Sequence, residues 1–293
     1  MTISIVTASL EQGRFLGAAI ESVQSQGADI EHVVMDGGST DGTRELLERN
    51  THRLAAWRSE PDHGQYAALN DGFALTTGEI MGWLNADDVY APGALAAVED
   101  VFRRFPEVEW LTSSFSATAN EEGFVFDVKR VVSFDGRAFG RGFNLPRPGA
   151  YAMYFIPQES TFWRRSLWER AGGLDAGLQF AGDFDLWARF YQHAELSCVR
   201  ALLGIFRSHP SQKSRSYAEY VAEAEPVLVR HGGKRYSSRE ARVRPLLARH
   251  LTNQRLWRLP NSARALLERR LIYRTRELMW VGNRWEPNTH YFV

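Results

Sequence analysis

The stretch EHVVMDGGSTDGTRELLERN (residues 31–50) passes from a strand pattern to a helix pattern through a glycine-rich loop. EHVVMD (31–36) is a run of apolar and β-branched residues, which predicts a strand. DGTRELLERN (41–50) predicts a short amphipathic helix, with Ser39, Thr40 or Asp41 as its N-cap. A strand followed at once by a helix is half of a βαβ unit, so this stretch favours an α/β fold.

The segments on either side repeat the alternation of strand and helix. ISIVTA (3–8) predicts the first strand, and GRFLGAAIESVQSQ (13–26) has its apolar residues at helical spacing. The pattern then predicts strands over 54–60 and 79–86 and helices over 64–78 and 92–105. Strands separated by single helices form a parallel sheet that is covered on both faces, and such strands are apolar throughout. We therefore expect a mostly parallel, Rossmann-like sheet flanked by helices.

The alternation fades beyond residue 106. One further strand is predicted over 108–114, no period is clear over 116–155, and helices are predicted over 164–173 and 182–192. From about residue 234 the pattern is helical and basic, with breaks at Pro245 and Pro260. We expect a domain over 1–230, with halves of about 1–112 and 113–230, and a helical extension over 231–293.

The net charge of zero hides an uneven distribution. From Lys234 onward the chain has about 14 Lys and Arg against 4 Glu, which leaves roughly −10 on residues 1–233. The single cysteine, Cys198, excludes an internal disulfide. No signal peptide is predicted, and no run of about 18 apolar residues predicts a membrane-spanning helix. A cytoplasmic protein is expected, with a basic region able to meet an anionic partner.

Acidic residues follow several of the predicted strands. Asp36, Asp62 and the pair Asp87–Asp88 each stand just after a strand. One such residue could be a turn residue or a helix cap, but the carboxyl ends of parallel strands meet at one edge, where ligands bind. Adjacent carboxylates need a cation, and Mg²⁺ or Mn²⁺ is usually held by one or two carboxylates together with substrate phosphates. On an extended chain Asp87 and Asp88 would point to opposite sides, so we expect one metal ligand and one acceptor for a hydroxyl.

The loop DGGSTDG (36–42) is dense in glycine but matches neither GxxxxGK[ST] nor GxGxxG. Its glycines would let the backbone approach a flat ligand, with Asp36 accepting a hydrogen bond from an N–H group. A simple tight turn is the alternative.

Two later segments carry further candidates. In AGDFDLWARF (181–190), Asp183 stands at a helix start, where it could cap the helix or act as a general base. In FRSHPSQKS (206–214), Arg207, His209 and Lys213 could neutralise the charge of a diphosphate or could form a solvated surface turn.

In this order, the motifs resemble those of the family 2 glycosyltransferases with the GT-A fold. The resemblance spans about residues 2–215. It depends on SIVTASLEQGRFLGAAIESVQSQ, VVMDGGSTDGT, EPDHGQYAALNDGFALTTGEIMGWLNADD and GGLDAGLQFAGDFDLWARF.

The resemblance implies a role for each matched position. Asp183 would be the catalytic base, and Asp88 and His209 would bind the metal, Mn²⁺ or Mg²⁺. The donor nucleotide sugar would contact Thr7, Ala8, Ser9, Asp36, Gly38, Asp62, Gln65, Asn70, Asn85 and Asp87. Candidate contacts to the diphosphate or acceptor are Arg207, Lys213, Gln158 and Trp187. The chain departs from the family at Leu69, where an arginine is common, and the first motif lacks the usual proline and asparagine.

The function implied is an inverting, metal-dependent transfer of a sugar from a UDP or dTDP sugar to a hydroxyl of a glycan or polyprenyl-diphosphate-linked glycan, in bacterial polysaccharide or cell-envelope synthesis. Residues 1–112 would bind the nucleotide sugar and 113–230 the acceptor. The basic extension would pack on the domain or bind a membrane surface; nucleic acid is not expected, and a homo-oligomer is compatible with the sequence. The alternatives are a non-catalytic nucleotide-sugar-binding protein and a sugar nucleotidyltransferase.

Overall fold

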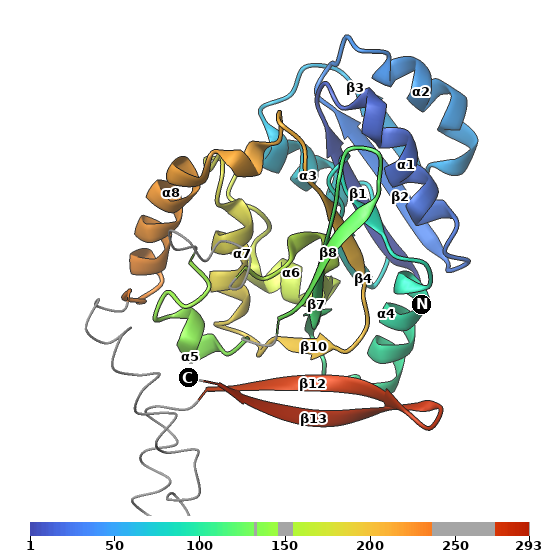
Figure 1. The fold of residues 1–293 in the computed structure, drawn as a ribbon. Helices are drawn as coiled ribbons and strands as arrows, with labels where there is room; N and C mark the ends of the chain where they lie inside the picture. The colour runs from blue at the N-terminus through green and yellow to red at the C-terminus, as the bar shows by residue number, and fades with distance from the viewer. Residues whose placement is uncertain (132–133, 146–154, 236–272, 293) are drawn as a thin grey trace, which may run out of the picture.

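The computed structural model describes residues 1–131, 134–145, 155–235 and 273–292, and these form two sheets surrounded by helices (Figure 1). The larger sheet has nine strands in the order β13-β12-β10-β6-β9-β4-β1-β2-β3, and the smaller has four in the order β5-β11-β7-β8. Most pairs in the larger sheet are parallel, while β9 and β13 run antiparallel to their neighbours. The predicted mostly parallel α/β sheet is confirmed.

The first part of the chain alternates strand and helix as predicted. Its elements are β1 (Ile3–Ser9), α1 (Gly13–Gln24), β2 (Ile30–Asp36), α2 (Thr43–Asn50), β3 (Ala56–Ser59), α3 (Gln65–Ala74), β4 (Ile80–Trp83), β5 (Val89–Tyr90) and α4 (Ala94–Arg104). The register pairs Ser9 with Asp36 and Asp36 with Ser59, so the carboxyl ends of β1, β2 and β3 lie in one row.

The second part is less regular. Its strands are β6 (Trp110–Ser113), β7 (Phe115–Ala119), β8 (Val125–Arg130), β9 (Phe162–Arg164), β10 (Ser197–Val199) and β11 (Gly204–Arg207). Its helices are α5 (Gly136–Phe139), α6 (Arg165–Ala171), α7 (Gly182–Phe190) and α8 (Tyr217–Arg230), with 3₁₀ turns at Thr51–Arg53, Gln158–Ser160 and Lys213–Arg215. Strand β5 pairs with β11 in antiparallel fashion. This pairing brings residues 87–88, just before β5, beside the end of β11 and the residues that follow it.

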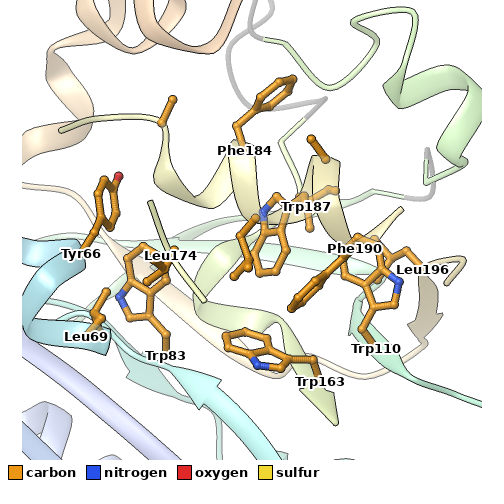
Figure 2. Packing of buried hydrophobic residues seen from close by; sticks show 14 of the residues in the cluster. Tyr66, Leu69, Trp83, Trp110, Trp163, Leu174, Phe184, Trp187, Phe190 and Leu196 are labelled. Carbon is orange, nitrogen blue, oxygen red and sulfur yellow. The ribbon is translucent and has the colours of Figure 1, made fainter. Parts of the chain in front are cut away.

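The helices cover both faces of the larger sheet. Helices α1, α2 and α4 pack on one face, and α3, α6 and α7 pack on the other. Side chains of β1 alternate between the two faces of the sheet. Val6 packs on the face covered by α3, α6 and α7, and Ile5 packs on the face covered by α1, α2 and α4. A continuous group of aromatic side chains fills the second face, with Trp110, Trp163, Trp187 and Phe190 at its centre (Figure 2).

The helical prediction for residues 231–293 is wrong over 273–292. These residues form a hairpin of β12 (Tyr273–Val281) and β13 (Arg284–Phe292), and β12 pairs in parallel with β10, which extends the main sheet (Figure 1). The start of β12 alternates, with Tyr273, Thr275 and Glu277 buried, and this period of two favours a strand. Pro245, Pro260 and the leucines at 266 and 267 lie outside the described residues.

Among the described residues, no helix combines the length and apolar character that crossing a bilayer requires.

Candidate functional site

The row at the ends of β1, β2 and β3 is held together by Asp36. Its carboxylate, only 2% exposed, accepts hydrogen bonds from the backbone N–H of Ser39 (3.0 Å), the hydroxyl of Ser59 (2.8 Å) and the hydroxyl of Ser39. Asp36 therefore fixes the loop after β2 to the end of β3, and it still has a free lone pair on Oδ1 for a ligand donor.

Two glycines bring this loop against the segment after β3. Gly38 has φ of +85°, and a Cβ there would lie 3.0 Å from the backbone nitrogen of Pro61. A Cβ on Gly37 would lie 3.1 Å from Oδ2 of Asp62. Asp62 in turn accepts a hydrogen bond from Gly64 N–H (2.8 Å) just before α3. The predicted residues Asp36, Gly38 and Asp62 therefore lie together.

The end of β1 contributes differently than predicted. The hydroxyl of Thr7 is fully buried, 3.0 Å from Nε2 of His32, so Thr7 faces the interior. Burial lowers the pKa of His32 to about 3 and keeps it neutral. Ser9 is 5% exposed, and its hydroxyl has no hydrogen-bond partner among the described residues, while Ala8 is partly buried between them. An unpaired buried hydroxyl at the sheet edge is a ready contact for a ligand.

Asn85 is the centre of a polar network at the end of β4. Its Oδ1 accepts from Nε2 of Gln65 (2.9 Å) and from the indole N–H of Trp83 (2.8 Å). Its Nδ2 donates to Oε1 of Gln158 (3.1 Å) and lies 3.3 Å from Oδ2 of Asp88. The network brings the predicted residues Gln65, Asn85 and Gln158 into contact.

The two neighbouring carboxylates have different surroundings. Residues 86–87 form a turn after β4, so the alternation of an extended strand does not apply. Oδ2 of Asp87 lies 2.9 Å from Nε2 of His209, and the His209 ring packs on Phe15 at 4.7 Å between centroids. Asp88 is 1% exposed, and its Oδ1 accepts from the backbone N–H of Arg207 (2.9 Å). Burial, together with the charges of Asp87 and Glu159, raises the pKa of Asp88 well above its usual value.

The Arg207 guanidinium lies over the Phe15 ring, 5.0 Å from its centroid. Its Nε has no partner among the described residues, and its charge faces Asp87 and Asp88. Arg207 thus leaves a donor free at the acidic pair.

Lys213 connects this group to Asp183. Its ammonium donates to Oε1 of Gln65 (3.0 Å) and lies over the rings of Tyr66 (5.2 Å) and Phe180 (5.5 Å). Its charge also reaches the Asp183 carboxylate at the start of α7. Burial raises the pKa of Asp183 to about 6, against hydrogen bonds from Phe184 N–H and the Tyr220 hydroxyl that lower it. A carboxylate with this pKa is ionised at neutral pH and basic enough to take a proton.

Two predicted contacts lie elsewhere. The amide of Asn70 accepts from the backbone N–H of Leu174 and donates to its carbonyl, both at 2.9 Å, so Asn70 ties α3 to the segment before α7. Trp187 is 2% exposed within the aromatic group and cannot touch an acceptor (Figure 2). Trp163 of the same aromatic group is buried as well.

Three residues at the site were missed by the sequence analysis. The Tyr66 ring lies against Gly182, where a Cβ would be 2.6 Å from ring atoms. Tyr220 and Glu223 of α8 contact Asp183 and the segment just before it. In YAEYVAE (217–223), Tyr220 and Glu223 are three residues apart, so a helix places them on the same face. Nothing in the sequence indicated what that face contacts.

The polar groups fit a metal that the substrate helps to bind. No cluster of three or more His, Cys, Asp or Glu suited to a metal exists in the described ranges. One carboxylate and one imidazole do meet, at Asp87 and His209, and a hard divalent ion commonly takes one or two protein carboxylates and completes its shell with phosphates and water. An imidazole suits Mn²⁺ better than Mg²⁺.

The chain is similar in sequence to known glycosyltransferases. The family model described as glycosyl transferase family 2 matches residues 4–112. An uncharacterized glycosyltransferase of Mycobacterium tuberculosis is 29% identical over 266 residues, which cover 87% of this chain and 95% of that protein. The O-antigen biosynthesis protein RfbC of Myxococcus xanthus is 31% identical over 64% of this chain and 14% of its own length.

Solved structures with the same fold are more distant in sequence. TarS 1–349 of S. aureus in complex with UDP-GlcNAc has a TM-score of 0.61 at 15% identity, covering 89% of this chain and 77% of that one. The mannosyltransferase PcManGT of Pyrobaculum calidifontis, in complex with GDP-Man and Mn²⁺, has a TM-score of 0.56 at 19% identity, covering 90% and 73%. At these identities the likeness establishes the fold.

Proposed function

We propose that this chain, whose residues 4–112 match the model of glycosyl transferase family 2, moves a sugar from a nucleoside-diphosphate sugar to a hydroxyl of a glycan or lipid-linked glycan. One observation supports this most directly: Lys213 touches the network around Asn85 through Gln65 and also acts on Asp183. The ammonium group of Lys213 therefore lies between the proposed donor site around Asn85 and the carboxylate of Asp183.

We propose that the nucleotide lies along the row formed by Ser9, Asp36 and Asp62. The free Ser9 hydroxyl and the remaining lone pair of Asp36 would bind the base, and a ring N–H of uracil or thymine is a suitable donor to Asp36. The glycines at 37 and 38 keep side chains off the loop that the base would approach. Solved structures with this fold hold UDP-GlcNAc in TarS and GDP-Man in PcManGT, so the fold itself is compatible with either nucleotide.

The geometry favours an exchange of the roles expected for the two adjacent aspartates. Asp87 and His209 would hold the divalent ion, because their polar atoms already meet. Asp88 would position the loop, because its Oδ1 accepts a hydrogen bond from the backbone N–H of Arg207. When bound, the ion would act as a Lewis acid that neutralises charge on the leaving diphosphate. Arg207 and Lys213 would add positive charge beside it.

Asp183 would remove the proton of the acceptor hydroxyl as that oxygen attacks the anomeric carbon. We assign one carboxylate to this task and none as a nucleophile, so a single displacement with inversion is the proposed course.

The test combines donor binding with turnover. We expect one nucleotide sugar among UDP, dTDP and GDP donors to raise the melting temperature in the presence of Mn²⁺. Asp183→Asn should retain that shift and lose about 10²–10⁴-fold in the acceptor-dependent rate at which the nucleoside diphosphate is released. Normal turnover in this variant would leave catalysis to another residue, while donor binding without turnover in the unmodified protein would favour a non-catalytic sensor. Pyrophosphate release from a nucleoside triphosphate would favour a nucleotidyltransferase.

A further inference from the structure

Helix α8 packs against α7, the helix that carries Asp183 at its start (Figure 1). Two α8 side chains one turn apart, Tyr220 and Glu223, point at that start. Neither is part of the donor site described above, and neither belongs to the motifs on which the sequence analysis depended.

Glu223 binds the backbone that leads into α7. One oxygen accepts from the N–H of Gln179 (2.8 Å), and the other accepts from the N–H groups of Phe180 and Ala181 (both 2.6 Å). The α7 N-cap residue, Ala181, has no side-chain oxygen to offer, so α7 has no cap of its own. A carboxylate that accepts three N–H bonds makes strong, charge-assisted contacts and suits the positive end of a helix. Glu223 therefore fixes the position of the three residues before Gly182 and Asp183.

Tyr220 acts on the carboxylate itself. Its hydroxyl donates to Oδ1 of Asp183 at 3.2 Å, the oxygen that also accepts from Phe184 N–H. This bond fixes the rotation of the carboxylate and favours its ionised form. Among the residues that the structure describes, Lys213, Tyr66 and Glu223 are further ionisable groups that act on this part of the site.

We infer that Tyr220 and Glu223 are positioning residues for the general base: Glu223 holds the start of α7 in place, and Tyr220 orients the Asp183 carboxylate toward the acceptor. This inference rests on the proposed role of Asp183. On this proposal α8 contributes to the rate of transfer by holding Asp183 in position, because a shift of the base by about 1 Å can lower the rate about 100-fold.

Tyr220→Phe tests the hydroxyl bond. Loss of the donor should raise the pKa of Asp183, so the acidic limb of kcat/KM should move to higher pH by about half to one unit, with turnover above pH 8 within about fivefold of the unmodified protein. If Tyr220 acted only through packing, the acidic limb of the kcat/KM profile would not shift, because phenylalanine keeps the aromatic ring.

Glu223→Gln tests the backbone bonds. An amide offers one acceptor oxygen and turns an NH₂ group toward the N–H groups, so kcat should fall by about 10–100-fold while the donor-induced melting shift persists. The matched control is Glu219→Gln, since Glu219 is an exposed acid in the first turn of the same helix, and this change should alter neither quantity.

The base role of Asp183 and the positioning roles of Tyr220 and Glu223 are contradicted by different results. If Asp183→Asn is inactive but Tyr220→Phe keeps its acidic limb and Glu223→Gln keeps its kcat, the positioning roles are wrong and the proposed function stands. If Asp183→Asn is fully active, the base assignment fails and both proposals fall together.

Discussion

Asp87 and Asp88 are adjacent in sequence but have different partners, because the backbone forms a turn at residues 86–87. Asp87 meets an imidazole, whereas Asp88 is buried against a backbone N–H. We expect Asp87→Asn to lower Mn²⁺-dependent turnover at least about 100-fold without a large change in melting temperature. Asp88→Ala should instead lower the melting temperature, since it leaves the Arg207 N–H buried without a partner.

A Mn²⁺ titration of turnover and a thermal melt of each variant separate these effects. Equal loss of Mn²⁺ affinity in the Asp87 and Asp88 variants, at equal stability, would contradict the exchange of roles.

The pKa of Asp183 sets the expected pH dependence. Its pKa is raised to about 6, and only the deprotonated carboxylate can accept the acceptor's proton. We expect log kcat/KM to fall with unit slope as the pH drops below about 6, and to be level above it until another group titrates. A steady-state profile from pH 4.5 to 8 measures this; a limb that persists unchanged in residual activity of Asp183→Asn would assign it to another group.

The position of some candidate residues was predictable, while their roles stay predictions. Asp36, Asp62 and Asp87 were expected near one edge because the carboxyl ends of parallel strands meet there, and the structure places Asp36 at the end of β2 and the other two in the segments after β3 and β4. The expectation that Asp87 and Asp88 point to opposite sides assumed a strand, but β4 ends at Trp83 and residues 86–87 form a turn. Which of the two carboxylates binds the ion was implied by the family resemblance and stays a prediction. Asn70 looked like a ligand contact because a side-chain amide that binds backbone 104 residues away leaves no mark on local sequence.

At the scale of elements, periodicity located the strands and helices of the first hundred residues within a few positions of their ends. It failed at 273–292, where arginines alternate with buried residues and resemble a basic helix if only charge is weighed. Whether such a segment becomes a strand depends on a free edge, here β10, which is made by residues far away.

Close packing between α3 and β1 gives a prediction at this scale. A Cβ on Gly72 would lie 2.5 Å from Cγ1 of Val6, so Gly72→Ala should destabilise the fold by about 1–3 kcal/mol. Gly17 in α1 is the control, because its Cβ would make an ordinary contact of 3.6 Å with Leu46. Gly17→Ala should stabilise by up to about 1 kcal/mol through helix propensity. Denaturant unfolding measures both, and equal effects would contradict the packing argument.

At the scale of the whole molecule, a buried charge joins the C-terminal hairpin to the rest. Glu277 accepts from the Ser114 hydroxyl (2.6 Å) and from Arg130 (3.0 Å), and it contacts His290. Burial opposes its charge, but these partners hold the pKa of Glu277 below its ordinary value. We expect Glu277→Ala to lower the unfolding free energy by about 1–3 kcal/mol, because it removes a charged acceptor from the Ser114 hydroxyl and from Arg130.

The sign of the pH effect follows from that lowered pKa. The stabilisation by Glu277 should be complete above pH about 4.5 and lost as the pH falls through the folded-state pKa. Urea unfolding of the unmodified and Glu277→Ala proteins should therefore converge toward low pH. A gap that stays constant down to pH 3 would contradict an ionised Glu277.

The charge asymmetry gives a further prediction for the whole chain. If the roughly +10 charge from Lys234 onward meets an anionic membrane, the protein should float with vesicles that contain phosphatidylglycerol and not with neutral ones. Glutamine at Arg242, Arg244, Arg249 and Arg255 should reduce flotation, whereas glutamine at Arg44, Arg49 and Arg103 should not. Equal recovery of both variants would remove the membrane proposal.

The pairing of β12 with β10 has a consequence for biosynthesis. Ribosomes make this chain from its N-terminus, and the main sheet cannot gain its last two strands until residues 273–292 have been translated. Until then β10 presents an open edge to the crowded surroundings of the nascent chain, so a translational pause within the preceding basic segment should make that intermediate a target for chaperones.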